Sequence, residues 1–456
     1  MKPVVIVGAG LSGLAAGVAL ASRSIPVILL EQRPFAGGRA YSFRDRTTGD
    51  VIDNGQHLLI AGYARTRAFL ETIGSAHLLE IQKTPELVFH HPRRGYLRLR
   101  LPPLPSPLHL LGGVLASDLF TGGDKFNVLR AGASIARGPV HASDVPQDWT
   151  IEQWLDRQGA SAENRASFWH PLAISIMNEM PEAASARVFV RSLREAFLSH
   201  RTSAALAIPK VGLSELLADP AVSFIRSCGG DVRFGVDVTE TIEQGGRVTG
   251  VQTRGSEDVD ASSVILAVPP TNVVRLLPDS CRVDFHLREI SSMAVSPILC
   301  VHLWYKHVVS PHAVLGVLGK RVQWVFRHSR TRAKGNAQGE RLSLVISAAY
   351  EEAAWTNDAL IEAGVEDCVA LFGEPARLPY HAVVIREKRA TFSLSPEVEA
   401  LRPGVCTPVP NLLLAGDWTA TGLPATVEGA IRSGEAAAER AARAVSPRSV
   451  GRSSMH

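Results

Sequence analysis

The sequence predicts an α/β fold in which a domain built on a parallel sheet carries an inserted α+β domain. Residues 4–21 run from a β-branched strand through a glycine-rich turn into an apolar helix, as in the first unit of a doubly wound sheet. Apolar runs of strand length return at residues 263–268 and 411–415, and residues 125–220 have helical spacing. Since 456 residues exceed one ordinary core, we expect two domains.

The turn after the first strand has the spacing of a dinucleotide-binding motif. Gly8 allows a sharp turn, Gly10 allows the backbone to approach a phosphate, and Gly13 lets the helix pack against the strand. A pyrophosphate would accept hydrogen bonds from the free N–H groups at the start of the helix. The motif therefore predicts a Rossmann-like site, with Leu11 and Ser12 at the dinucleotide.

An acidic residue ends the second predicted strand. Residues 26–30 form an apolar run, and Glu31 follows at the distance from the glycines where a carboxylate accepts hydrogen bonds from an adenosine ribose. Gln32 is expected beside it. Because a carboxylate repels a 2′-phosphate, Glu31 argues against NADP at this site.

A second glycine motif separates FAD from NAD. Residues 32–42 follow directly and resemble the second motif of the flavin-containing amine oxidase and phytoene desaturase superfamily. Gly37 and Gly38 would let the backbone pass close to the flavin diphosphate, and Arg39 would offset its charge. The resemblance implies FAD as the cofactor and an FAD-binding domain of the GR2, amine oxidase type.

The next segment supplies the candidate catalytic residues. In the superfamily this segment places an Asp-x-Gly sequence beside the flavin ring, and Asp53 and Gly55 match that pattern. Gln56 and His57 follow immediately, where they could face the ring. A histidine there could transfer a proton, and the alternative interpretation is a packed, hydrogen-bonded histidine.

Composition narrows the function classes. The net charge of +4 is small for this length, so the total carries no sign of nucleic-acid binding. Five scattered cysteines without a CxxC pair predict buried thiols in a reducing cytosol, and neither a disulfide framework nor a metal site. No uninterrupted apolar run is long enough to span a membrane. Glycines break the apolar N-terminus, which argues against a signal peptide.

The inserted domain begins with a segment of unusual composition. Residues 87–101 alternate arginine with apolar residues and predict a hairpin, and residues 102–115 are strongly apolar and punctuated by proline. A basic cluster beside an apolar loop could rest on an anionic leaflet. A substrate-domain core with one solvated face is the other interpretation, and the pattern leaves both open.

Two later segments resemble the remaining flavin-binding parts of the superfamily. Residues 223–238 are similar to the segment whose final valine, here Val238, presents backbone groups to adenine. The apolar strand predicted at residues 411–415 would place Gly416 and Asp417 at the diphosphate and ribityl region of FAD. A helix starting there would direct its N-terminal dipole at the flavin, through three consecutive residues: Ala425, Thr426 and Val427.

Residues 53–57, 416–419 and 422–429 together resemble the squalene-associated FAD-dependent desaturase family. The resemblance covers nearly the whole chain and is strongest at its two ends. Amine oxidases build an aromatic cage before the flavin, and one wall is a Tyr two residues before the Glu-Gly of the last motif. Thr426 occupies that position here, which favours a terpenoid over an amine.

The resemblance implies reductive removal of the allylic hydroxyl of hydroxysqualene, giving squalene for bacterial hopanoid synthesis. Loss of the hydroxyl needs a proton donor, and our candidate is His57, with Asp53 fixing its surroundings and Gln56 beside it. Lys388 and Arg389 are weaker candidates near the flavin. The implied partners are a lipophilic isoprenoid and, transiently, membrane lipid; no motif identifies the electron donor.

Other functions stay compatible with the sequence. A carotenoid or squalene desaturase would run the flavin in the oxidative direction. A non-catalytic prenyl-binding flavoprotein is more remote, because Glu31 and the pairs at 37–38 and 416–417 form a complete flavin site. An amine oxidase is more remote because Thr426 replaces the cage tyrosine.

We expect a cytoplasmic enzyme, peripheral on the inner face of the cytoplasmic membrane, with two discontinuous domains. The FAD-binding domain would comprise residues 1–82, 211–277 and 381–446, and the substrate domain residues 83–210 and 278–380. Residues 447–456 are expected to form a disordered basic tail.

Overall fold

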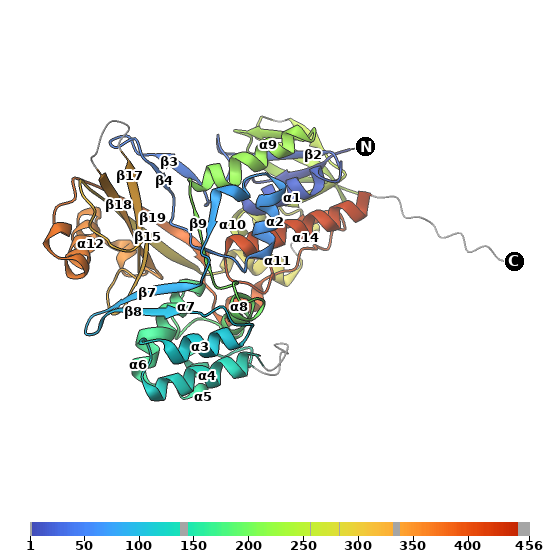
Figure 1. Ribbon diagram of the computed structural model, residues 1–456. Helices are drawn as coiled ribbons and strands as arrows, with labels where there is room; N and C mark the ends of the chain where they lie inside the picture. The colour runs from blue at the N-terminus through green and yellow to red at the C-terminus, as the bar shows by residue number, and fades with distance from the viewer. Residues whose placement is uncertain (1, 137–144, 256, 282, 332–337, 446–456) are drawn as a thin grey trace.

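The computed structural model describes residues 2–136, 145–255, 257–281, 283–331 and 338–445. In Figure 1 a parallel sheet with its helices lies at the upper right, a second large sheet lies at the left, and a layer of helices lies below both. Segments from both ends of the chain meet in the first body, where α1 and α14 lie side by side.

The first body is built on a five-stranded parallel sheet with the strand order β10-β2-β1-β14-β20. Val4 and Ile6 of β1 pack among the helices, whereas Val5 and Val7 pack against an antiparallel sheet on the other face. Burial on both faces explains why the strands are continuous apolar runs. The strands are β1 (Val4–Val7), β2 (Val27–Glu31), β10 (Asp231–Phe234), β14 (Ser263–Leu266) and β20 (Leu412–Leu414); the helices α1 (Leu11–Ala21), α9 (Asp219–Ser227) and α14 (Val427–Val445); and the covering strands β11 (Val238–Gln244), β12 (Arg247–Thr253) and β13 (Asp258–Asp260).

Two glycines allow α1 to pack at main-chain distance on both sides. A Cβ on Gly13 would collide with the carbonyl oxygen of Gly8, and a Cβ on Gly434 would collide with that of Ser12. Since the obstacle is main chain and cannot rotate away, only glycine fits at either position. The first contact holds α1 against the turn after β1, and the second holds α14 against α1.

The second body is a seven-stranded sheet, in which only the pair β16–β7 is parallel. Leu299, Val301 and Leu303 point to the face that α12 (Asn357–Phe372) covers. The alternate residues of the same strand, including Ile298 and Cys300, point to the opposite face. The strands, in sheet order, are β19 (His381–Phe392), β15 (Val295–Tyr305), β18 (Gln338–Ser347), β17 (Trp324–Thr331), β16 (Val314–Val317), β7 (Glu86–His91) and β8 (Gly95–Arg100).

The helical layer lies against that opposite face. Trp154, Trp169 and Phe189 form its centre, with ring centroids 5.4 to 6.4 Å apart in edge-to-face pairs. The helices are α3 (Leu108–Ala116), α4 (Gly122–Ala136), α5 (Ile151–Gln158), α6 (Ala162–Asn164), α7 (His170–Met177) and α8 (Ala186–Leu198).

Small elements connect the bodies. A three-stranded sheet, β5-β9-β6, joins the end of the helical layer to the first body. The connecting elements are β3 (Ser42–Arg44), β4 (Val51–Asp53), β5 (Leu59–Ile60), α2 (Ala64–Thr72), β6 (Leu79–Ile81), β9 (Leu206–Pro209), α10 (Pro270–Leu276), α11 (Phe285–Glu289) and α13 (Pro396–Leu401).

One domain boundary needs correction. β19 pairs with β15 from Phe392 opposite Val295 to His381 opposite Trp304, so it belongs to the substrate-domain sheet and not to the FAD-binding domain. The predicted boundary at residue 381 therefore moves to the end of this strand. The predicted tail at 447–456 lies outside the described residues.

Two further expectations differ from the structure. The apolar segment 102–115 is not wholly a loop, because helix α3 begins at Leu108, directly after the last proline of the run. Cys228 and Cys406 are exposed, whereas the other three cysteines are buried. Within the described residues, no helix is long and apolar enough to cross a membrane.

We expect Gly434→Ala to lower the free energy of unfolding by about 1–3 kcal/mol, because the added methyl forces α14 away from α1. Gly132→Ala is the matched control: it lies inside α4, where a Cβ meets nothing within 4 Å, and should raise stability by about 0.5–1 kcal/mol. Chemical denaturation of both variants measures the difference. Equal stability of Gly434→Ala and the wild type would contradict the packing argument.

Candidate functional site

A cavity of about 560 Å³ runs along the carboxyl ends of the parallel strands, where doubly wound sheets bind their ligands. We call it the cofactor cavity. Gly13 does not line it but packs on Gly8, and Gly55 and Gln56 line a second cavity instead. The other predicted cofactor residues all line it: Gly8, Gly10, Leu11, Ser12, Glu31, Gln32, Gly37, Gly38, Arg39, Val238, Gly416, Asp417, Ala425, Thr426 and Val427.

The two glycine motifs meet at the N-terminus of α1. Gly10 forms a parallel bridge with Gly37, and a Cβ on Gly38 would lie 3.0 Å from the Cα of Gly10. No side chain caps the helix at this end. Backbone N–H groups at a helix start, lined by residues without side chains, form a cradle that suits a diphosphate, so this part of the cavity fits FAD.

Glu31, the last residue of β2, lines the cofactor cavity. Its Oε2 accepts a hydrogen bond from the main-chain N–H of Ala9 at 2.7 Å, and its Oε1 accepts one from that of Arg33 at 2.9 Å. The carboxylate is therefore buried but held in place, and each oxygen keeps a further lone pair. This arrangement suits two ribose hydroxyl donors.

Arg39 is paired within the protein. Its guanidinium donates 2.6 Å hydrogen bonds to the carboxylate of Asp417 and to the carbonyl of Ala390 on β19. The positive charge of Arg39, expected to offset the diphosphate of FAD, is therefore already paired with the carboxylate of Asp417. Three other cations line the same cavity, and the sequence analysis assigned a cofactor role to none of them: Arg33, Arg275 and Arg389.

A second cavity, of about 340 Å³, lies between the helical layer and the seven-stranded sheet. We call it the apolar cavity because aliphatic and aromatic side chains dominate its wall. These include Leu58, Leu87, Leu99, Leu101, Leu172, Ile176, Phe197, Ile298, Trp324, Phe326 and Val345. The two cavities share a set of lining residues that we call the junction: Arg39, His57, Glu387, Ala390, Thr391, Ala425, Thr426 and Val427.

His57 is the one imidazole at the junction. Its Nδ1 lies 2.7 Å from the carbonyl oxygen of Gly55, which can only accept, so Nδ1 carries a proton and Nε2 is left for other partners. Burial lowers the pKa of His57 below its ordinary value; Arg39 lowers it further, whereas the Gly55 carbonyl and Asp53 oppose this. The ring is therefore mainly neutral at pH 7.

The other catalytic candidates take different places. The carboxylate of Asp53 accepts hydrogen bonds from the Ser42 hydroxyl at 2.6 Å and the Leu213 N–H at 2.9 Å, and it lines neither cavity. Asp53 thus influences His57 through its charge. Gln56 lines the apolar cavity, Arg389 lines the cofactor cavity, and Lys388 lines neither.

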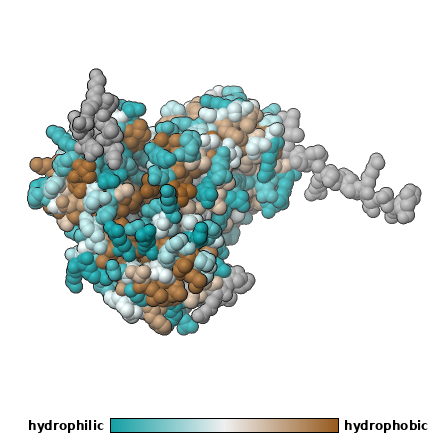
Figure 2. Space-filling view, in the orientation of Figure 1, coloured by the Kyte–Doolittle hydropathy of each residue, from teal (hydrophilic) through white to brown (hydrophobic). Residues whose placement is uncertain are grey.

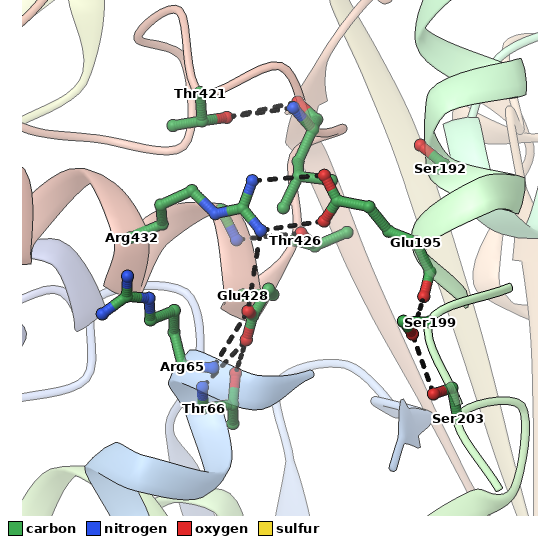
Figure 3. Close-up of polar contacts among 12 residues, drawn as sticks. Arg65, Thr66, Ser192, Glu195, Ser199, Ser203, Thr421, Thr426, Glu428 and Arg432 are labelled. Atoms are coloured by element: carbon green, nitrogen blue, oxygen red, sulfur yellow. Dashed lines mark hydrogen bonds and ion pairs between the residues drawn. The ribbon is translucent and has the colours of Figure 1, made fainter. Parts of the chain in front are cut away.

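One wall of the apolar cavity is polar and joins α2, α8 and α14 (Figure 3). Glu428 accepts hydrogen bonds from the main-chain N–H groups of Arg65 and Thr66 and from the Thr66 hydroxyl, at 2.7–3.0 Å. Glu195 of α8 accepts two from the guanidinium of Arg432, at 2.8 and 3.4 Å. The helical layer is thereby tied to the helix whose first residue lies at the junction.

Sequence reasoning missed Tyr63 and Glu195, which also line the apolar cavity. Among the described residues the Tyr63 hydroxyl has no hydrogen-bond partner. Burial raises the pKa of Tyr63 above its ordinary value, and Glu428 and Glu195 add to the shift, so the phenol stays a neutral donor. No local pattern marks either residue, because Tyr63 precedes α2 and Glu195 belongs to α8, and only the tertiary structure brings them to one wall.

Comparison with known proteins shows which proteins the chain resembles. A family model described as flavin-containing amine oxidoreductase matches residues 11–442. Hydroxysqualene dehydroxylase of Rhodopseudomonas palustris is 33% identical over 450 residues, covering 96% of this chain and 98% of that protein. The 15-cis-phytoene desaturase of Synechococcus elongatus is 24% identical, covering 96% and 95%. The solved structure of an oxidoreductase from Methanosarcina mazei is similar in fold, with a TM-score of 0.73 and 17% identity over 96% of this chain and 100% of that one.

We expect Glu31→Ala to weaken FAD binding about tenfold or more, because the substitution removes the ribose acceptor and leaves two buried N–H groups without a partner. The measurement is the flavin-to-protein absorbance ratio after extensive desalting. Glu240→Ala, on the exposed side of β11, is the control and should retain its flavin. Full flavin retention by Glu31→Ala would contradict the assigned role.

Proposed function

The chain belongs to the flavin-containing amine oxidoreductase family, and on this basis we propose that it removes the allylic hydroxyl of hydroxysqualene reductively, giving squalene and water. It is an FAD-dependent oxidoreductase of the carotenoid and squalene type. The specific reaction is supported by similarity to hydroxysqualene dehydroxylases over almost the whole chain. The observation that carries the proposal is the position of the His57 imidazole at the junction of a cofactor cavity and an apolar cavity.

The chain's part in the reaction is to supply a proton. Bound and reduced, FAD supplies the hydride that replaces the hydroxyl. Because hydroxide is a poor leaving group, its oxygen must gain a proton as the carbon–oxygen bond breaks. Since Nδ1 of His57 is engaged by the Gly55 carbonyl, Nε2 takes up the proton and gives it to the hydroxyl, which leaves as water.

The apolar cavity accounts for the substrate class. Its aliphatic lining would solvate an isoprenoid chain and exclude water from the reacting carbon. The Tyr63 hydroxyl and the Gln56 amide have no hydrogen-bond partners of their own among the described residues, so they are available to hold the substrate hydroxyl. A lipophilic substrate also predicts contact with the inner face of the cytoplasmic membrane.

An amine substrate fits the junction less well. The residues that the two cavities share include no Phe, Tyr or Trp, so no aromatic cage surrounds the reacting position there. Thr426 lies at the junction, and its hydroxyl accepts a hydrogen bond from the Gly429 N–H at 3.1 Å, which caps α14.

We expect the anaerobically reduced holoenzyme to be reoxidised by hydroxysqualene, with squalene formed in equal amount. Flavin absorbance follows the redox change, and extraction with mass analysis identifies the lipid. If hydroxysqualene leaves the flavin reduced while squalene or phytoene bleaches the oxidised enzyme, the chain is a desaturase and the proposal is wrong.

His57→Gln should lower turnover about 10²–10⁴-fold while flavin stays bound, because a glutamine amide is far too weak an acid to protonate the leaving hydroxyl. In the wild type, the protonated fraction of His57 is complete below its pKa and is lost as pH rises through it. Since that pKa lies below its ordinary value, turnover should already fall as pH rises towards neutral.

Tyr63→Phe provides the matched comparison for this pH dependence. The raised pKa of Tyr63 cannot produce a decline near neutral pH, so this variant should keep the wild-type pH profile and show a higher KM. An unchanged pH profile in His57→Gln would remove His57 from the mechanism.

A further inference from the structure

Helix α3 has one buried and one exposed apolar face. His109, Gly113 and Val114 are buried, whereas Leu108, Leu111 and Leu115 are 51%, 41% and 53% exposed. The three leucines follow the i, i+3, i+7 spacing, so they lie along one side of the helix. A helix with apolar side chains on its solvent side as well as on its core side offers a surface for a further binding partner.

Neighbouring residues widen the exposed face. Leu104, 42% exposed, lies against α3 at Gly112, where an added Cβ would be 3.4 Å from a Leu104 methyl. Phe126 of α4 is 69% exposed, and the adjacent Lys125 donates from Nζ to the Leu115 carbonyl at 2.7 Å. Figure 2 shows apolar residues gathered at the lower end of the molecule, in the region of α3 and α4. We call this surface the α3 apolar face: Leu104, Leu108, Leu111, Leu115 and Phe126.

Cationic side chains flank the α3 apolar face. Arg98 and Arg100 are exposed on β8, whose main chain lies along α3: the Ser117 hydroxyl donates to the Arg98 carbonyl at 2.7 Å, and Gly113 lies against the Arg100 carbonyl. Apolar side chains edged by cations match a leaflet in which anionic headgroups surround acyl chains.

The arginines of the predicted basic cluster, Arg93, Arg94, Arg98 and Arg100, lie in different surroundings. The guanidinium of Arg94 donates to the carbonyls of Asp118 and Leu119, so it is engaged within the protein. Arg93 lies at the turn of the β7–β8 hairpin, at the far end of β8 from Arg100. Arg98 and Arg100 therefore remain beside the α3 apolar face, and Arg98 also lies 3.8 Å from the carboxylate of Glu86 in an exposed ion pair.

The buried side of α3 adjoins the apolar cavity. A Cβ on Gly113 would contact the Leu101 side chain, and Leu101 lines that cavity. The Ser106 hydroxyl donates to the carbonyl of Leu198 at 3.2 Å, directly after Phe197, another lining residue. Helix α3 and the lining side chains beneath it therefore lie between the exposed leucines and the cavity.

We propose that the α3 apolar face rests on an anionic phospholipid bilayer, with its leucines among the acyl chains and Arg98 and Arg100 at the headgroups. At nine residues, α3 lies in the interface and does not cross the membrane. The inference rests on the proposed function only in that a lipophilic substrate dissolved in the bilayer would then lie next to the apolar cavity.

The test is co-sedimentation of the holoenzyme with vesicles of phosphatidylcholine, with and without phosphatidylglycerol. We expect binding to the anionic vesicles, and the double variant Leu111→Ser/Leu115→Ser should reduce the partition coefficient about tenfold or more. Leu378→Ser is the matched control: Leu378 is 81% exposed and lies outside this face, so partitioning should not change. Retained flavin shows that each variant is folded.

Charge variants test the second half of the proposal. Arg98→Gln/Arg100→Gln should remove the preference for anionic over neutral vesicles, whereas Arg93→Gln should not. Wild-type protein that stays in the supernatant, or a dimer that the leucine substitutions dissociate, would overturn the proposal. Turnover of detergent-dispersed hydroxysqualene is measured separately, so failure of the proposed reaction and failure of membrane binding give different results.

Discussion

The relative position of the two cavities depends on the contacts of Arg39. Its guanidinium binds the Asp417 carboxylate and the Ala390 carbonyl, and these three residues come from the second glycine motif, the end of the parallel sheet and β19. Charge-assisted hydrogen bonds of this kind are about twice as strong as neutral ones. Because the contact lies at the junction, it sets the register between the body that holds the cofactor and the sheet that walls the apolar cavity.

Burial gives His57 two opposed properties as a proton donor. The low-dielectric surroundings that lower its pKa make the imidazolium a stronger acid, and the same surroundings make the imidazolium rarer at neutral pH. The negative charge of Asp53 opposes this lowering of the pKa. Its carboxylate lies outside both cavities, where Ser42 and Leu213 hold it. The site therefore balances acid strength against the fraction of molecules that carry the proton.

Most of the cofactor cavity could be predicted from the sequence because its signals are local. The turn at Gly8–Gly13, the carboxylate of Glu31 and the start of α14 each follow from a few neighbouring residues. Long-range pairing is what these local signals leave out. β19 joins a sheet whose other strands lie far away in the sequence, and Gly55 and Gln56 line the apolar cavity because the chain crosses the junction between Asp53 and His57. Tyr63 and Glu195 reach one wall only after both α2 and α8 have docked near α14, so no spacing rule could place them together.

The glycine contact between α1 and α14 also constrains how the chain acquires its structure during synthesis. β1 pairs with β2 early, but its other neighbour, β14, is made more than half a chain later, and α14, the last helix within the described residues, is made later still. Until then, a nascent chain exposes a hydrophobic strand edge and an uncovered helix, the features that recruit chaperones and favour aggregation. The wall of the flavin site is therefore complete only once α14 has been made, and a protein truncated before α14 lacks Val427 and Ala430 of the cofactor cavity.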